Sequence, residues 1–330
     1  MKTIKTMLFI FLSCLTLTLQ AQKIGLVLDS YVSDRWYLDK KLIAEKIKAL
    51  GGECIVEVAN GDAAEQVNLS KKLIKQGVKV LIVVAVDAVK SAEIVAIAKE
   101  AHVPVISYDR LIMSNDIALY ISYNNTKVGE LQAQYMLDRF PTGKYVLLNG
   151  PVSDNNAVQI RNGQMKVLQP SISNGKIKLL ADFILSEWGE IEALMKMDEF
   201  FSSSEEKPEV VIAANDALAD GTIQALPPDL DRKIAMTGQD ADLSAVRYII
   251  SGKQTMTIYK PIKPLAYMAA ELAFKLAKGG DAVGKTKFQS GSISVDAIFL
   301  DPIVVNKANY NETVVKDGHV KASELILRQN

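Results

Sequence analysis

Cysteine and histidine are scarce in this sequence of 330 residues, which has two of each. The cysteines are Cys14, within an apolar run near the start, and Cys54. With one cysteine beyond residue 21, that part of the chain can form no internal disulfide, so its stability must come from packed apolar cores. His102 and His319 lie far apart in the sequence and lack metal-ligand spacing with Cys54. We therefore expect no metal site.

Net charge, the dinucleotide motif GxGxxG and the nucleophile motif GxSxG are also lacking. Lys and Arg together number 38, as do Asp and Glu, so the formal net charge is zero, and no basic run stands out. A nucleic-acid partner is therefore not expected. No GxGxxG follows the first apolar run, and GxSxG does not occur. We accordingly expect no cofactor and no enzyme of these classes.

Long apolar runs are absent after residue 21, so no later stretch predicts a membrane span. Residues 1–21 differ, because Lys2 and Lys5 precede an apolar run that ends in Leu19-Gln20-Ala21. This pattern predicts a cleaved secretory signal and an exported mature chain that begins near Gln22. Cys14 as a lipid-attachment site is the alternative, but the apolar residues continue past it, as in the middle of a signal.

Short β-branched apolar runs alternate with longer amphipathic stretches along the rest of the chain. In the first series the predicted strands are 23–29, 54–60, 79–85 and 103–108, with helices at 35–50, 63–76 and 87–101. In the second series the predicted strands are 144–150, 176–185, 208–216, 233–240 and 254–259. The alternation predicts an α/β fold with two Rossmann-like lobes, each a parallel sheet flanked by helices.

The two lobes are expected to share the chain in alternating pieces. The amphipathic run 261–278 is interpreted as a return to the first lobe, and no long Gly/Ser-rich linker separates the two series. We therefore assign 22–127 plus about 261–298 to the N-terminal lobe, and 128–260 plus about 299–330 to the C-terminal lobe. Several short crossings between lobes would form a hinge.

Polar residues gather where the predicted strands end, which is where open parallel sheets bind ligands. They are Asp29, Asp34, Arg35, Trp36, Asp109, Arg110, Asp154, Asn155, Asn156, Glu187, Trp188, Asn215, Asp216, Gln239, Asp240, Asp242 and Lys260. Sugar hydroxyls donate to carboxylates and amide oxygens and accept from Arg or Lys, while opposite charges keep a pocket near neutral. The C–H faces of a pyranose lie well against indole rings, and the two tryptophans fall one in each lobe. The pattern predicts a site for a neutral polyhydroxylated ligand.

Each of these residues also has a purely structural interpretation. Trp36 and Trp188 are alternatively helix-start residues packed on a sheet edge, and Asp109-Arg110 a solvated turn pair. Asn215 and Asp216 are alternatively helix caps, which is the interpretation we prefer for Asp216. Asn155 and Asn156 cannot be separated by chemistry, and Lys260 is alternatively an ordinary exposed lysine. As paired carboxylates, Asp109 and Asp240 leave glycoside hydrolysis as an enzymatic alternative, although their surroundings favour binding.

Several longer motifs stand out along the chain: DRWYLDK at 34–40, SYDRLI at 107–112, YISYNNTKVGELQA at 120–133, DNNA at 154–157, RNGQMKVLQP at 161–170, AANDALADGTIQAL at 213–226, GQDADL at 238–243 and QTMTIYKPI at 254–262. Together they closely resemble the D-xylose-binding family among the type I sugar-binding proteins of ABC importers. The resemblance spans most of 23–320, and departures lie at SEWGE (186–190) and PPDLDRK (227–233). The first departure affects the match around Trp188.

The resemblance implies a non-catalytic periplasmic receptor, a monomer whose two lobes close on one monosaccharide, with D-xylose expected first and another pentose second. It implies that the ligand contacts are Arg35, Trp36, Asp109, Arg110, Asn156, Trp188, Asn215, Asp240 and Lys260. The implied partner is the membrane permease of an ABC importer. A membrane receptor kinase, for which the chain would be a sugar-sensing subunit, is the alternative.

Overall fold

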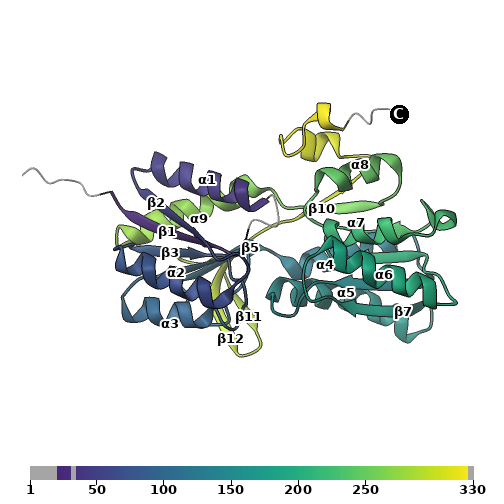
Figure 1. Ribbon diagram of the computed structural model, residues 1–330, viewed down its shortest axis with the longest axis horizontal. Coiled ribbons are helices and arrows are strands. Elements are labelled where there is room, and N and C mark those ends of the chain that lie inside the picture. Colours follow the sequence, from purple (N-terminus) through teal and green to yellow (C-terminus); the bar gives the residue numbers. More distant parts are fainter. Residues whose placement is uncertain (1–20, 31–34, 326–330) are drawn as a thin grey trace, which may run out of the picture.

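A computed structural model describes residues 21–30 and 35–325. It shows two α/β lobes side by side (Figure 1). The predicted signal, except for Ala21, lies outside the described residues, as do Cys14 and Asp34. Within the described ranges, no helix is both long enough and apolar enough to cross a membrane.

The first lobe is built on a seven-stranded sheet with the strand order β11-β12-β5-β4-β3-β1-β2. Its elements are β1 (Lys23–Leu28), α1 (Arg35–Ala49), β2 (Glu53–Val58), α2 (Ala63–Lys75), β3 (Val80–Val83), α3 (Ala92–Glu100), β4 (Val105–Tyr108), β5 (Leu119–Tyr123), α9 (Ile262–Ala277), β11 (Thr286–Ser290) and β12 (Ile293–Leu300). The strands pair in parallel except for β11, which runs antiparallel to β12 at the sheet edge. Helices α1 and α9 lie along one face, whereas α2 and α3 cover the other (Figure 1).

The second lobe has a four-stranded parallel sheet with the order β7-β6-β8-β9. Its elements are α4 (Asn125–Leu137), β6 (Gly143–Asn149), α5 (Asn155–Ser173), β7 (Ile177–Ile184), α6 (Glu190–Ser203), β8 (Val210–Ala213), α7 (Asp216–Ala225), the short 3₁₀ turn η1 (Pro228–Leu230), β9 (Ala235–Met236), α8 (Leu243–Ser251), β10 (Met256–Tyr259), β13 (Ile303–Asn306), the π-helical turn η2 (Asn311–Val315) and the 3₁₀ turn η3 (Ala322–Glu324). The predicted α/β class with parallel sheets flanked by helices is confirmed.

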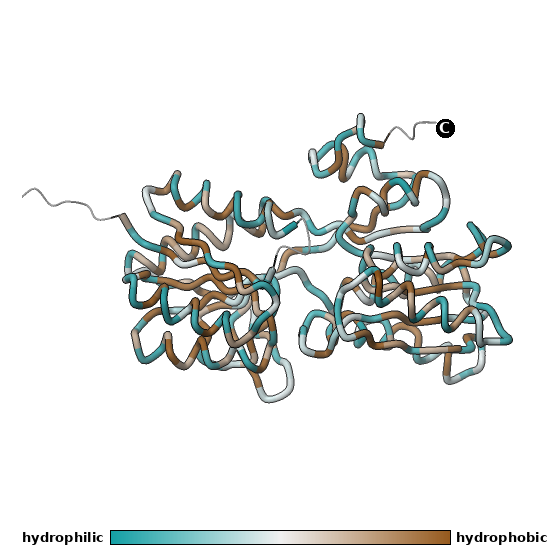
Figure 2. The backbone as a smooth tube through the Cα atoms, viewed as in Figure 1, coloured by the Kyte–Doolittle hydropathy of each residue, from teal (hydrophilic) through white to brown (hydrophobic). Residues whose placement is uncertain are grey.

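Each lobe buries its own apolar core, because the strands of both sheets are almost continuous apolar runs covered by helices. Figure 2 shows these hydrophobic segments along the strands, with hydrophilic residues on the outward parts of the helices. Two core clusters lie on the two faces of the first sheet, and a third fills the second lobe. Residues at the ends of these strands are therefore held by rigid elements.

Within residues 35–325 the chain passes between the lobes three times, after β5, after β10 and after β12. Two of these crossings touch, since the Tyr123 hydroxyl donates to the Pro261 carbonyl at 2.6 Å. Crossings of a few residues each suit a hinge. The lobe limits predicted from the sequence stay a proposal about which parts of the chain move together.

Two predicted elements differ in the structure. The strand predicted at 254–259 was expected in the second sheet, but β10 pairs antiparallel with β13 in a separate two-stranded sheet. Backbone bonds still join it to the chain after β9, since Ile258 N–H donates to the Gly238 carbonyl. The helix predicted from Asp87 begins at Ala92, because the Asp87 carboxylate accepts from the Val89 and Lys90 amides and forms a separate turn.

Candidate functional site: an inter-lobe cleft of paired charges

The strand ends of the two lobes meet, and side chains from both lobes are within bonding distance there. Arg110 Nε, after β4, lies 3.0 Å from Asp154 Oδ2 of the second lobe. Asn156 Nδ2, in the first turn of α5, donates to Asp109 Oδ1 at 3.1 Å. Arg35 Nη1 lies at a longer distance, 3.9 Å, from Asp240 Oδ1. These pairs form a polar boundary between the lobes, which we call the inter-lobe cleft.

Asp109 occupies the centre of the first-lobe side of this cleft. Its carboxylate also accepts from Arg35 at 2.9 Å, and its side chain is 4% exposed. Burial acts to raise the pKa of Asp109, but Arg35, Lys260 and Arg110 outweigh it, so the pKa is lowered and the group is anionic. Its backbone is in the left-handed region with φ +62°. Such a conformation in a non-glycine residue is held by its surroundings and is frequent at functional positions.

Arg110 joins two carboxylates from different lobes. Its guanidinium donates to Asp29 Oδ2 at 2.8 Å and to the Ala85 carbonyl at 3.1 Å, and it pairs with Asp154. The planar, multidentate guanidinium suits this position better than a lysine would. The positive charge is therefore compensated on both sides of the cleft.

Arg35 rests on a buried pair that sequence reasoning did not single out. Its Nε donates to Asp39 Oδ2 at 3.3 Å, and the other oxygen of Asp39 accepts from the Tyr108 hydroxyl. Asp39 is fully buried; burial, only partly offset by Arg35, raises its pKa. The spacing of four residues along α1 from Arg35 to Asp39 was the available sequence signal. This pair aims the guanidinium toward Asp109.

Lys260 and Asp240 form the second-lobe ion pair nearest the hinge. Lys260 Nζ lies 3.1 Å from Asp240 Oδ1, and Lys260 is 6% exposed. The interpretation of Lys260 as an ordinary exposed lysine is therefore wrong. Asp240 mirrors Asp109, because it follows a buried strand, has φ +96°, and donates its amide to a neighbouring strand at Ile258.

The two tryptophans have different surroundings. Trp36 is 4% exposed in the first-lobe core, and the guanidinium of Arg35 lies 4.4 Å from its ring centre. Trp188 is half-buried and donates its indole N–H to Asp154 Oδ2 at 3.0 Å. Its ring lies against Gly150, where a Cβ would come within 2.6 Å of the ring atoms. Trp188 thus reaches the cleft although the surrounding SEWGE motif departs from the family pattern.

The hydrogen bonds in the structure distinguish Asn155 from Asn156 and Asn215 from Asp216. Asn156 turns to Asp109, whereas Asn155 Nδ2 donates to Ser290 Oγ of the first lobe at 3.1 Å. Asn215 is the N-cap of α7, because its Oδ1 accepts from the Leu218 amide at 3.0 Å. The preference for Asp216 as the cap was therefore wrong. For Asn215 the structure shows this capping bond, and its contact with a ligand stays a prediction.

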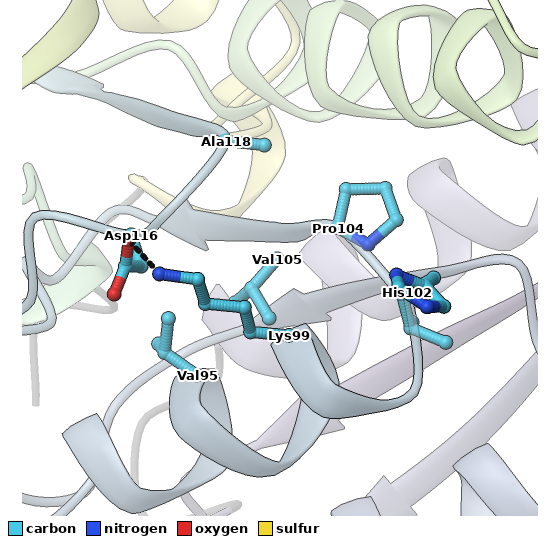
Figure 3. Close-up of a pocket in the computed structure, with 8 residues that line it drawn as sticks. Val95, Lys99, His102, Pro104, Val105, Asp116 and Ala118 are labelled. Atoms are coloured by element: carbon cyan, nitrogen blue, oxygen red, sulfur yellow. Dashed lines mark hydrogen bonds and ion pairs between the residues drawn. The ribbon is translucent and has the colours of Figure 1, made fainter.

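A separate surface pocket lies at the amino-terminal end of β4, the end of the strand opposite to Asp109. Its lining side chains are Val95, Lys99, His102, Val103, Pro104, Val105, Asp116 and Ala118, and Figure 3 shows the ion pair of Lys99 and Asp116 across it. That pair is solvent-exposed and of little energetic weight. In the part of the chain that the structure describes, no three His, Cys, Asp or Glu side chains are grouped to hold a metal ion.

Two α/β lobes with paired charges between them are typical of solute-binding proteins, and the comparisons agree. Residues 24–281 match the family model described as the periplasmic binding protein domain. The chain belongs to this family. The resemblance recognised in the sequence motifs is confirmed.

Curated relatives extend the match to almost the whole chain. The D-xylose-binding periplasmic protein of Haemophilus influenzae is 41% identical over 303 residues, which cover 91% of this chain and 91% of that protein. The protein of the same name from Escherichia coli strain K12 is 41% identical and covers 92% of each chain. Both relatives are binding proteins, so the prediction of a receptor class and not an enzyme is confirmed.

Solved structures share the fold. A carbohydrate transporter solute-binding protein from Chloroflexus aurantiacus, in complex with D-glucose, superposes with a TM-score of 0.85 at 26% identity. The alignment covers 92% of this chain and 98% of that one. This similarity extends over both lobes.

Proposed function

We propose that this protein is an exported receptor that binds D-xylose between its lobes and presents it to the membrane permease of an ABC importer. The observation that carries the ligand is the 41% identity, over nine-tenths of the chain, to two D-xylose-binding periplasmic proteins. The periplasmic location rests on the same relatives and on the predicted signal at 1–21.

The cleft offers a set of hydrogen-bonding groups suited to this ligand. Asp109 and Asp240 would accept from sugar hydroxyls, and Arg35, Arg110 and Lys260 would donate to them. Asn156 and Asn215 would do either, because an amide carries both kinds of group. Trp36 and Trp188 would supply aromatic surface for the C–H faces of the ring. The nearly balanced charges favour a neutral ligand over an ionic one.

Binding would close the lobes, because a ligand shifts the equilibrium toward the conformation in which it contacts both sides. A micromolar Kd corresponds to about 8 kcal/mol. A few charge-assisted hydrogen bonds and stacked ring surfaces can supply this after ordering costs. The closed form would then be what a membrane partner recognises.

Tryptophan fluorescence gives a direct test, because the sequence has two tryptophans and both lie at the proposed site. Titrating the mature protein with D-xylose should change the emission saturably, and the change should be absent in a variant carrying both Trp36→Phe and Trp188→Phe. A flat titration with D-xylose alongside a clear response to another sugar would refute the ligand and leave the receptor class intact. Neighbouring genes for a permease and ATPase, and not for a kinase, would support the importer as partner.

A further inference from the structure

Asp216 is a buried carboxyl group that ties three segments of the second lobe together. It is the first residue of α7 and is 1% exposed. Its Oδ1 accepts from Gln254 Nε2 at 2.9 Å, and Thr257 Oγ1 lies within 2.9 Å of both oxygens. Its Oδ2 accepts from the Asp242 amide at 2.9 Å. All of these bonds are to groups of the protein, so Asp216 acts on protein segments.

The segment most affected is the loop 238–242, which follows β9 and carries Asp240. Gly238 lies so close that a Cβ there would come within 1.8 Å of Asp216 Oδ1. The backbone amide of Asp216 donates to the Gln239 carbonyl at 2.9 Å. Together with the bond from Asp242, Asp216 thus touches this loop on both sides of Asp240.

Asp240 needs such support because its backbone is strained. Asp240 and Ala241 have φ values of +96° and +59°, a region that favours glycine. Strained residues persist where the surrounding bonds over-determine them. The Asp240 amide is held by the Ile258 carbonyl at 2.7 Å, and the bond from Asp242 to Asp216 closes the other end. In this conformation the carboxylate of Asp240 faces Lys260 and Arg35.

We propose that Asp216 is a positioning residue for sugar binding, which fixes the loop 238–242 so that Asp240 is presented to the ligand. The proposal rests on the proposed function, in which Asp240 contacts the sugar. It assigns to Asp216, the acid of the AAND motif, a role different from that of Asn215, which caps the helix.

Two variants separate the hydrogen bonds from the bulk of the side chain. Asp216→Ala leaves the Asp242 amide without its acceptor, so we expect at least a tenfold loss of D-xylose affinity by calorimetry. Asp216→Asn can keep that acceptor, and its new N–H group can be met by Gln254 Oε1, which has no partner among the described residues. It should therefore bind within about threefold of the wild type. Equal losses in both variants would contradict the proposal.

A double-mutant cycle tests whether the effect passes through Asp240. In an Asp240→Ala background, Asp216→Ala should change the affinity less than twofold. The same tenfold loss in both backgrounds would overturn the proposal. Val211→Ala, in the core of the same lobe, is the control for lost stability and should lower the melting temperature without a tenfold loss of affinity.

Hydrogen exchange gives a readout that needs no ligand. In Asp216→Ala the amides of Asp240 and Asp242 should exchange at least tenfold faster, whereas unchanged protection would contradict the proposal. If the wild type bound no sugar, the proposed function would fail and this measurement would still decide the role of Asp216. If Asp216→Ala did not fold, Thr257→Val would replace it and should raise exchange at the same amides and weaken binding several-fold.

Discussion

Arg110 contacts carboxylates of both lobes, so its role extends beyond the ligand contact that we propose for it. A strand-end residue that contacted only a ligand would contribute little to either core, so its loss would affect binding alone. The structure adds two ion pairs, to Asp29 and Asp154, at side chains that are 13% exposed or less. Removing the guanidinium leaves two buried carboxylates without a cation, and breaking one partner of such a pair is destabilising.

Arg110→Ala should therefore abolish most D-xylose binding, by a hundredfold or more, and also lower the free energy of unfolding by on the order of 3 kcal/mol. Calorimetric titration and urea unfolding measure the two effects separately. Lys99→Ala, at the exposed pair of the surface pocket, is the control and should change neither. An Arg110→Ala protein with wild-type affinity would exclude this residue from the site.

Gly150 leaves room for the indole of Trp188. An added Cβ would come within 2.6 Å of the ring, so Gly150→Ala must displace Trp188. We expect about a tenfold loss of sugar affinity with little change in stability, because the displaced ring is half-buried. In a Trp188→Ala background the same substitution should have no further effect on affinity. An additive loss there would mean that Gly150 acts on binding by another route.

At the residue scale, the sequence predicts well which residues lie near the cleft and predicts poorly which side chains they contact. Asp109, Asp240 and Lys260 were found because each follows a buried strand, and the structure places them in one cleft. The sequence did not predict a role for Asp39, because it lies within a segment with the pattern of an amphipathic helix. Its partner Tyr108 belongs to the apolar strand itself. Long-range pairs depend on how two elements pack, which a local pattern does not contain.

At the scale of elements, the C-terminal segment contacts the loop 238–242, which carries Asp240. His319 packs against Tyr259 of β10 with ring centres 4.7 Å apart and the two rings tilted, and its Nε2 lies 3.1 Å from the Ala241 carbonyl. Burial lowers the pKa of His319, although the nearby Asp240 and Asp317 carboxylates oppose this shift. The neutral imidazole is therefore the form that fits against the loop 238–242.

His319 should make stability depend on pH in a defined window. Because its folded-state pKa lies below the unfolded value near 6.5, stability is fully present above that value. It is lost as the pH falls toward the folded-state pKa, by up to about 1.4 kcal/mol per pH unit. Urea unfolding between pH 8 and pH 5 measures this, and His319→Gln should flatten the dependence. An unchanged slope in His319→Gln would assign it to other groups.

Element order and type follow from the alternation of apolar runs, but pairing between strands does not. The predicted strand 254–259 exists as β10, yet its partner is β13, which is more than 40 residues further along the chain. The antiparallel edge strand β11 and the turns η2 and η3 have no strong periodicity in the sequence. Their conformation is set by the elements they pack on.

At the scale of the whole molecule, the lobes contact each other outside the charged cleft as well as within it. The Ala88 amide donates to the Ser153 carbonyl at 2.9 Å, and Asn155 reaches Ser290 across the boundary. Such contacts exist only when the lobes are together, so they favour closure whatever sugar is bound. In the proposed function these contacts would affect how tightly the protein binds, and the cleft would determine which ligand it prefers.

Asn155→Ala should accordingly weaken the binding of every accepted sugar by a similar factor of about threefold to tenfold, mainly through faster dissociation. Stopped-flow fluorescence with two sugars measures this. Ser290→Ala removes the partner and should give the same loss, with no additive effect in the double variant. A loss for one sugar only would place Asn155 in the ligand site instead.

The central claim is that the whole molecule closes on D-xylose. Isothermal titration of the mature protein with D-xylose, D-ribose, L-arabinose and D-glucose tests it most directly. We predict one site per chain, the highest affinity for D-xylose, and a negative heat-capacity change from the apolar surface buried on closure. No heat and no thermal shift with D-xylose, alongside binding of another of these sugars, would contradict the account.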